Sequence, residues 1–353
     1  MSVGKWFWVW LAAALVPYWA AGWATAGEPA RNEIRFVSPR SLVPYVEAMA
    51  QVFIARRPGP PPSLETGVPR AVADAFCAGA GAAHPDLLVL PRRLSYGEYQ
   101  RCQAQGAGPV LELLLGSEVL VLAVRPDVAP FSLTARQLFL ALAAEIPQQG
   151  RFTVNRTQSW RQLDPALPDL PIQVLVPAGD PSARELFEAA VLEVGCRGVT
   201  EIQDIFSAQE RLARCRGLRA DGAAKETPVD GMAPALRAHP PGLIAILPLT
   251  YWTVLAADLT ILPLDGRLPT QANLDAGVYP LSRPIYLYGK LAQAGDGKTY
   301  GVADSLRQFL RDVGGEQGVE PGGLFEQMGL VLPAPPVRVR QRLDALMSRP
   351  LVR

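Results

Sequence analysis

The residues best placed to do chemistry lie in the segment Gly179-Asp180-Pro181-Ser182-Ala183-Arg184. Apolar residues before this segment predict a strand, and those after it recur at helical spacing. A loop that opens a helix directs backbone N–H groups and the positive end of the helix dipole at one point. Ser182 and Arg184 can add donors there, which makes the segment a candidate anion cradle. The alternative is that Asp180 or Ser182 only caps an ordinary helix.

Composition limits the kinds of partner. The chain has 353 residues, of which 49% are hydrophobic and 19% charged, as expected for a globular protein with a large core. Its formal net charge of +1 argues against nucleic acid as a partner, because polyanion binding normally requires a basic excess or patch. Any anion specificity must therefore be local.

The N-terminal segment has the pattern of a secretory signal. One lysine precedes an apolar stretch, and the triplet Ala24-Thr25-Ala26 follows it, so we expect residues 1–26 to be removed by cleavage. A retained membrane anchor is the alternative, because the apolar run approaches the roughly 20 residues that span a bilayer. No later stretch has that length and apolarity. The mature chain is therefore expected to be soluble outside the cytoplasm.

Cysteine and histidine usage argues for export and against an enzyme. Four cysteines permit two disulfides, and pairing nearest neighbours is one of three arrangements. No CxxC, HExxH or GxSxG motif occurs, and His84 and His239 each precede proline. We therefore expect no metal site, no cofactor and no catalytic residue.

The order of elements predicts parallel sheets. Ile34–Val37, Pro62–Leu64 and Asp86–Leu90 are expected strands, and each leads through a short loop into a helix. Ligands of such sheets bind where the strands end, and the three loops carry Ser41, Thr66 and Arg92.

The second half continues the alternation. Strands are expected at residues 117–124, 242–249 and 285–288, and helices at 133–143 and 305–312, the first opened by Ser132 or Thr134. Together the two halves suggest two α/β lobes.

Several longer blocks resemble those of the periplasmic phosphate-binding proteins that serve phosphate ABC transporters. These blocks are FCAGAGAAHPDLLVLPRRLSYGEYQRCQAQG, LTARQLFLALAAEI, SWRQLDPALPDLPIQVL and AGVYPLSRPIYLYGK. The resemblance runs in order from about Ile34 to Pro333. It implies a type II periplasmic-binding-protein fold, with two α/β lobes that close over one oxyanion in the cleft between them. It also implies disulfides between Cys77 and Cys102 and between Cys196 and Cys215.

The family's binding residues carry over in part to the first lobe. Ser41 and Leu42 match the first loop, which supplies a hydroxyl and the following N–H to the ligand. Thr66-Gly67-Val68-Pro69-Arg70 stands where the family has a Thr-Gly-Ser-Gly-Gly-like loop, so the serine is missing and Pro69 removes a donor. Arg70 is a new cation in this loop that can contact the ligand. The alternative is that Arg70 is only an exposed residue at the start of a helix. Arg92 keeps an arginine that one branch of the family has.

The second lobe carries the fourth loop of the family, a Thr-Ser-Gly-Thr-Arg segment. Asp180-Pro181-Ser182-Ala183-Arg184 corresponds to it, so Arg184 is kept, Ala183 replaces a threonine and Asp180 adds a negative charge. Ser182 can replace the lost hydroxyl after a shift of one residue. The candidate ligand set is Ser41, Leu42, Thr66, Gly67, Arg70, Arg92, Ser182, Ala183 and Arg184.

These observations predict a non-enzymatic, monomeric solute-binding protein for phosphate or a related oxyanion, with an ABC transporter permease as partner. The alternative is a paralogue with a degenerate site that acts in envelope interaction or sensing. The expected division is a signal peptide at 1–26, lobe 1 at 31–118 and 255–345, and lobe 2 at 119–254.

Overall fold

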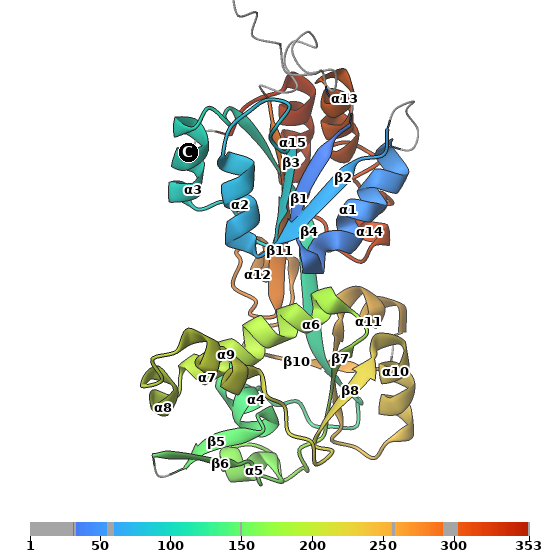
Figure 1. Cartoon of the computed structure of the whole chain (residues 1–353). Helices are drawn as coiled ribbons and strands as arrows, with labels where there is room; N and C mark the ends of the chain where they lie inside the picture. Colours follow the sequence, from blue (N-terminus) through green and yellow to red (C-terminus); the bar gives the residue numbers. More distant parts are fainter. Residues whose placement is uncertain are drawn as a thin grey trace, which may run out of the picture.

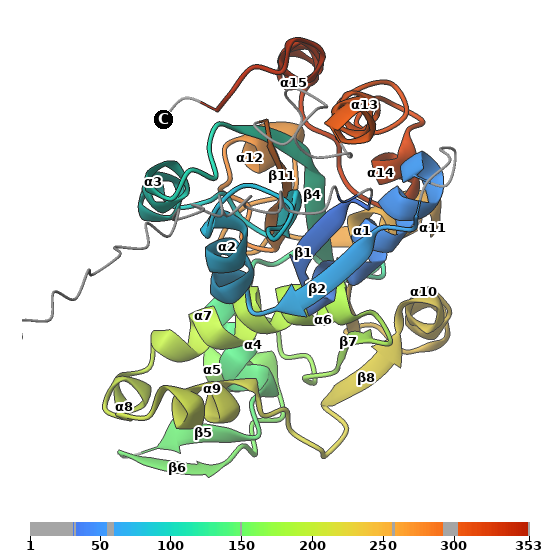
Figure 2. The same cartoon turned by 45° about the horizontal axis from the view of Figure 1, so that its top comes forward.

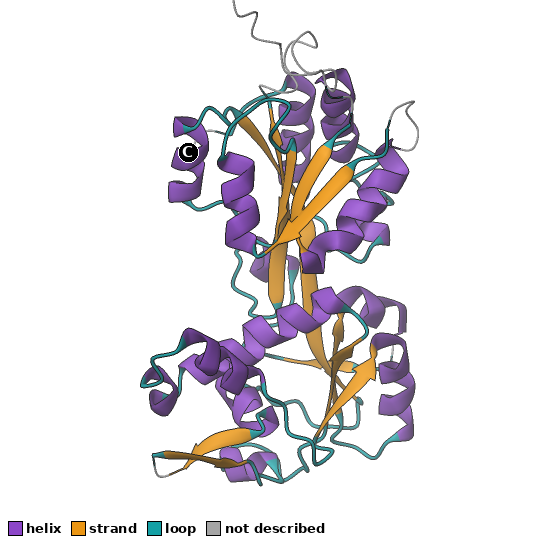
Figure 3. Cartoon of the chain, viewed as in Figure 1, coloured by secondary structure: helices purple, strands orange, loops and turns teal. Residues whose placement is uncertain are grey.

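The computed structural model describes residues 31, 33–54, 60–148, 150–255, 258–291 and 303–351. The expected signal segment lies outside the described residues. The chain forms two α/β lobes, one above the other, and each holds strands between layers of helices (Figures 1 and 3). The expected two-lobed α/β architecture is confirmed. No helix within the described ranges combines the length and apolarity needed to span a membrane.

Lobe 1 is built on the strand order β2-β1-β3-β11-β4. Strands β1, β2 and β3 are parallel, and β11 runs antiparallel to β3 and β4. Its elements are β1 (Arg35–Pro39), the 3-10 helix η1 (Arg40–Leu42), α1 (Val43–Met49), the π-helix η2 (Ala50–Ile54), β2 (Ser63–Gly67), α2 (Pro69–Cys77), β3 (Leu87–Leu90), α3 (Tyr96–Ala104), β11 (Ser282–Lys290), α13 (Ala303–Val313), α14 (Leu324–Gln327) and α15 (Pro335–Met347).

Both faces of the lobe 1 sheet are covered. Leu87 and Val89 of β3 belong to one apolar cluster, whereas Leu88 and Leu90 belong to another. Alternate residues of a strand point to opposite faces, so an uninterrupted apolar run is what a sheet buried on both sides requires. This explains why the sequence Asp86–Leu90 predicts a strand without alternation.

Lobe 2 follows the same plan, with β4 continuing beside β9, β7 and β8. Strands β7, β8 and β9 are parallel to one another. Its elements are α4 (Ala135–Leu142), β5 (Glu145–Gln148), β6 (Arg151–Val154), α5 (Trp160–Leu163), β7 (Val174–Ala178), α6 (Pro181–Phe187), the π-helix η3 (Glu188–Glu193), α7 (Val194–Arg197), α8 (Thr200–Gln203), α9 (Ala208–Arg216), β8 (Ala224–Pro228), α10 (Val229–Ala238), β9 (Ile244–Pro248), α11 (Leu249–Leu255), β10 (Thr260–Leu262) and α12 (Gln271–Asp275).

Strand β4 (Val110–Val124) connects the two lobes. Its first part pairs with β11 in lobe 1, and its last residues pair with β9 and β10 in lobe 2. Gly116 lies in the crossing, where an added Cβ would come within 2.8 Å of the Leu330 Cβ and 3.0 Å of the Val331 carbonyl oxygen. Only glycine permits this close approach of a second backbone segment.

The expected division of the chain differs from the observed packing at one boundary. Strand β10 pairs with the lobe 2 part of β4, and Leu262, Leu264 and Tyr279 pack in the lobe 2 core. The return to lobe 1 therefore comes with β11, although the sequence places residues 255–345 in lobe 1. Loops without apolar periodicity give no sign of which lobe they cover.

A helix cap and two disulfides that were expected from the sequence are present in the structure. Thr134 caps α4: its Oγ1 accepts the Gln137 backbone N–H at 3.1 Å, and its own backbone N–H donates to the Gln137 Oε1 at 2.9 Å. The structure joins Cys77 to Cys102 and Cys196 to Cys215, as the resemblance implies.

Candidate functional site

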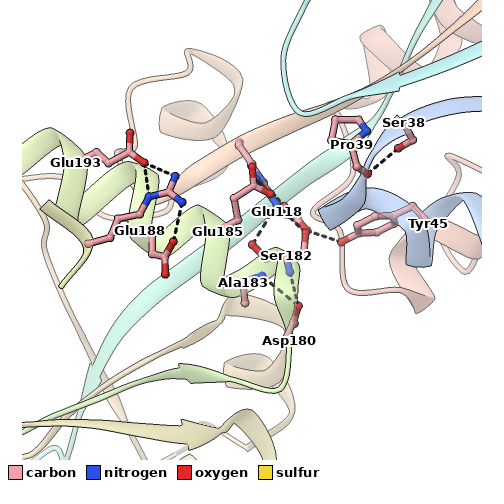
Figure 4. A network of polar contacts seen from close by, with 12 residues as sticks. Ser38, Pro39, Tyr45, Glu118, Asp180, Ser182, Ala183, Glu185, Glu188 and Glu193 are labelled. Carbon is pink, nitrogen blue, oxygen red and sulfur yellow. Dashed lines mark hydrogen bonds and ion pairs between the residues drawn. The ribbon is translucent and has the colours of Figure 1, made fainter. Parts of the chain in front are cut away.

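Four buried side chains meet where the two lobes face each other. Tyr45 comes from α1 in lobe 1, Ser182 from α6 in lobe 2, and Glu118 and Arg283 from the crossing strands β4 and β11. Each is less than 10% exposed. Figure 4 shows the Tyr45 and Ser182 side chains approaching Glu118 from opposite sides. We call these four residues the interlobe cluster.

The Glu118 carboxylate is the centre of the interlobe cluster. Its Oε1 accepts a hydrogen bond from the Tyr45 hydroxyl at 2.9 Å and another from the Ser182 hydroxyl, and its Oε2 accepts one from Arg283 Nε. Arg283 Nη2 also donates to the Ser182 Oγ at 2.7 Å and to the Ser182 carbonyl at 3.1 Å. Bonds to an ionised acceptor are stronger than neutral ones. One carboxylate therefore ties both lobes to the crossing strands.

Electrostatics keeps the Tyr45 hydroxyl protonated. Burial raises the pKa of Tyr45, and the negative charge of Glu118 and its hydrogen bond to the hydroxyl raise it further, while Arg283 acts in the opposite direction. The pKa of Tyr45 therefore lies above its ordinary value. The hydroxyl stays a donor throughout the physiological range.

Strand register explains the ion pair. Arg283 and Glu118 are direct cross-strand partners in the antiparallel pairing of β11 with β4. Side chains directly opposite each other in such a pair lie within reach of one another. Removing both charges from water is costly, and good hydrogen-bonding geometry offsets this cost. The Ser182 and Tyr45 hydroxyls provide these additional bonds.

A second carboxylate closes the start of α6. Asp180 Oδ1 accepts the backbone N–H groups of Ser182 at 3.0 Å and Ala183 at 3.1 Å. Asp180 is therefore the N-cap of α6, as the alternative interpretation of this loop held. The two N–H groups that an anion cradle would offer are directed to the protein's own carboxylate. The segment expected to bind the anion thus lies at the lobe interface, but its backbone N–H groups are already bonded to Asp180.

A cavity of about 440 Å³ lies beside the interlobe cluster. Lobe 1 contributes Tyr45 and part of α14, whereas lobe 2 contributes residues from α6, α10, β9 and α11. Its charged lining residues are Glu118, Asp180 and Glu326, and Leu120, Leu186, Val229 and Met328 are among its apolar ones. The wall thus combines acidic and apolar groups.

The lobe 1 residues predicted to bind ligand lie near the ends of adjacent strands. Ser38 and Thr66 are partners in the β1–β2 register, and Pro39 pairs with Gly67, which brings the first two loops side by side. Helix α6 contacts η1, which contains Ser41 and Leu42, and Figure 2 shows α6 facing the ends of β1 and β2. Leu42 is fully buried. Ser41 is buried, and its Oγ has no hydrogen-bond partner within the described structure.

Two of the arginines predicted to bind ligand are committed to carboxylates. Arg92 holds Glu98 through two bonds of 2.7 and 2.8 Å, which lower the pKa of Glu98 to about 2. Arg184 donates to Glu188 at 2.6 Å and also to Glu226.

The third arginine of the predicted set lies in solvent. The Arg70 side chain is 84% exposed and lies 3.8 Å from Asp74. Of the nine predicted residues, the structure thus brings only Ser182 into the interlobe cluster, and Ala183 lines the adjacent cavity. The ligand role of all nine residues stays a prediction.

Three members of the interlobe cluster were not predicted from the sequence. Glu118 precedes the apolar part of β4 and Arg283 lies at the start of β11, and a buried charge in a strand requires a partner. The two charges were visible in the sequence, but nothing there indicated that Glu118 and Arg283 pair with each other. Tyr45 carried no signal, because its position in an apolar helix segment equally fits the core.

Within the described parts of the chain, no group of three or more histidine, cysteine, aspartate or glutamate residues has the arrangement of a metal site. The hydrogen bonds at the candidate site come from two hydroxyls and one guanidinium, which surround one carboxylate.

Comparison with known proteins gives the family context. Residues 24–311 match the model of the PBP superfamily domain. Protein SphX from Synechococcus elongatus is 23% identical over 220 residues, a match that covers 60% of this chain and 55% of SphX. The chain thus spans about half the length of this curated relative.

Solved structures share the fold. A possible phosphate-binding protein from Planctomyces limnophilus superposes with a TM-score of 0.61 at 18% identity, over 90% of this chain and 99% of that one. PstS from Borrelia burgdorferi gives 0.56 at 13% identity over 86% and 99% of the two chains. An ABC-type phosphate transport receptor from Vibrio cholerae gives 0.52 at 15% identity over 85% and 100%. The Planctomyces limnophilus protein is described as a possible phosphate-binding protein and the Vibrio cholerae protein as a phosphate transport receptor.

Proposed function

The chain belongs to the PBP superfamily, and from this premise we propose that it is a periplasmic receptor that captures a small oxyanion between its lobes. The bound ligand would then be delivered to the permease of an ABC transporter. The resemblance of the sequence to phosphate-binding proteins, and the similar structures that are described as phosphate-binding or phosphate-transport proteins, support phosphate or a related oxyanion as the ligand. The signal-like N-terminal segment and the two disulfides support the periplasm.

The observation that carries the proposal is that donors from both lobes converge on one carboxylate, which belongs to Glu118. Tyr45, Ser182 and Arg283 direct two hydroxyls and a guanidinium at the Glu118 carboxylate. Hydroxyl and guanidinium groups are the donors that proteins use for phosphate and carboxylate. The buried Ser41 hydroxyl, which has no partner among the described residues, is a further donor in the first loop.

A second candidate function is supported by the same carboxylates. Glu118 and Asp180 use donors that a ligand would need, and Arg92 and Arg184 are paired with other acids. A chain with such a cleft would act as an interaction or sensing protein of the cell envelope, without capturing an oxyanion. The two candidates make opposite predictions for ligand binding.

Calorimetric titration of the mature protein with phosphate, sulfate, arsenate and methylphosphonate tests the proposal. We expect one saturable site for at least one of these anions, with a matching rise in the melting temperature. If none produces heat and none raises the melting temperature, oxyanion capture is wrong and the interaction function is supported. A permease gene and an ATPase gene beside the gene for this chain would support the transport step.

A further inference from the structure

We propose that Glu118 is an internal counter-anion that occupies the place of a ligand's oxygen atoms, so that an oxyanion can bind at the interlobe cluster only by displacing it. This inference rests on the proposed function in one respect, the position of the ligand. It goes further in naming the residue that determines whether any anion is accepted.

The bonding pattern at Glu118 is that of a bound ligand. Donors from three separate elements surround its carboxylate, and the two hydroxyl donors both serve Oε1 while Arg283 serves Oε2. A strand side chain that serves only stability would not need one donor from each lobe. Here Tyr45 of lobe 1 and Ser182 of lobe 2 share one oxygen atom, which is how an anion in a cleft holds two lobes together.

Proton counting makes the ligand and Glu118 competitors. A serine or tyrosine hydroxyl has one proton to donate, so a hydroxyl bonded to Glu118 cannot also donate to an incoming anion. Arg283 has further N–H groups, but one is directed at Ser182, and Nη1 lies 3.5 Å from Glu185 Oε2. A ligand oxygen would therefore have to take the position of a Glu118 oxygen to obtain these donors.

Charge balance determines which anions are excluded while Glu118 is in place. The cluster holds one carboxylate against one guanidinium, and Glu185 lies next to the same guanidinium. The adjacent cavity wall also carries Asp180 and Glu326. Adding an anion beside the intact pair would leave uncompensated negative charge in a buried site, which is unfavourable. The cluster can accept a new anion once the Glu118 charge has been removed.

The test is chemical rescue of Glu118→Ala. This substitution removes the carboxymethyl part of the side chain, which acetate replaces atom for atom. We expect a lowered melting temperature that sodium acetate restores saturably, whereas the same concentrations of sodium chloride do not. Glu326→Ala is the matched control, because Glu326 also lines the cavity but its Oε2 accepts the Gly322 N–H. Acetate should not rescue this control.

A second variant keeps the inference testable if Glu118→Ala does not fold. Glu118→Gln preserves the shape of the side chain and removes its charge. We expect sulfate or phosphate to bind Glu118→Gln at least about tenfold more tightly than wild type. In wild type the anion has to break hydrogen bonds to a charged acceptor, whereas in Glu118→Gln the acceptor is neutral. Equal or weaker binding, or a folded Glu118→Ala that neither acetate nor formate stabilises, would overturn the inference.

The outcomes separate this inference from the proposed function. Rescue by acetate, with no binding of any anion to the wild type, supports the role of Glu118 and contradicts oxyanion capture by the natural chain. Binding of phosphate to the wild type without rescue of Glu118→Ala supports the proposed function and contradicts the role of Glu118.

Discussion

Arg283 lies directly opposite Glu118 on the two strands that cross between the lobes, and the two side chains form a buried ion pair. The pair joins the crossing strands to each other, and the hydroxyls of Tyr45 and Ser182 join it to both lobes. A single salt bridge therefore lies between the lobes, at the place where we propose that a ligand binds.

We expect Arg283→Met to lower the free energy of unfolding by about 3–5 kcal/mol, because it leaves the Glu118 charge buried without its counter-ion. The double variant Glu118→Leu/Arg283→Met should lose less than Arg283→Met alone, since it removes both buried charges. Urea unfolding measures both values. Arg101→Met is the control, because the Arg101–Asp74 pair is nearly half exposed and contributes about 1 kcal/mol or less. A double variant that loses as much stability as Arg283→Met, or more, would contradict this coupling.

Ser182→Ala should weaken the binding of any oxyanion about tenfold or more, because it removes a hydroxyl donor from the interlobe cluster. Arg184→Ala should have a smaller effect, since the Arg184 guanidinium is engaged by Glu188 and Glu226. Titration calorimetry of the two variants compares them directly. A larger loss for Arg184→Ala would show that this arginine leaves its carboxylates to bind the ligand, as the resemblance implies.

Lys290 gives a prediction for the pH dependence of stability. Its side chain is fully buried, donates to the Gly79 carbonyl at 2.5 Å and lies 4.8 Å from the Phe76 ring centre. Burial lowers the pKa of Lys290 from 10.5 to about 7; Asp86 opposes the shift and Arg31 adds to it. Between these two values the unfolded chain binds a proton that the folded chain does not, so stability rises with pH across this window.

The Lys290→Met variant isolates this effect. Wild type should gain stability relative to the variant by up to about 1.4 kcal/mol per pH unit between pH 7 and 10. Below pH 7 the lysine is charged in both states, so its full burial penalty is present and Lys290→Met should be the more stable protein. Thermal unfolding from pH 6 to 10 checks this. A difference between the two proteins that does not change with pH would be inconsistent with a lysine that is neutral in the fold.

The disulfide between Cys196 and Cys215 should stabilise lobe 2. It joins the end of α7 to α9 and closes a loop of 19 residues along the sequence. Cys196→Ser/Cys215→Ser should lower the free energy of unfolding by about 2–5 kcal/mol, because the unfolded chain regains the freedom that the bridge removes. Thermal unfolding with and without reductant measures this loss. The double variant should respond less to reductant than wild type does, and an equal response would count against a stabilising bridge.

The sequence alone determined much of the fold. The segment Asp86–Leu90 predicts a buried strand, and Ser132 or Thr134 predicts the start of a helix, because these signals depend on near neighbours in the chain. The structure places this strand between two apolar clusters and shows that Thr134 is the cap. The location of the candidate site at Asp180–Arg184 could be predicted for the same reason. The sequence also showed that Asp180 introduces a negative charge there.

Only the tertiary structure decided where the donors are directed. Glu118 and Arg283 are separated by more than 160 positions, and no local pattern indicates that the register of two crossing strands places them opposite each other. Tyr45 and Ser182 reach the same carboxylate because two lobes close on it, which is a property of their packing. Sequence patterns thus show which groups can bind an anion, whereas the fold decides that these groups already hold one of the protein's own carboxylates.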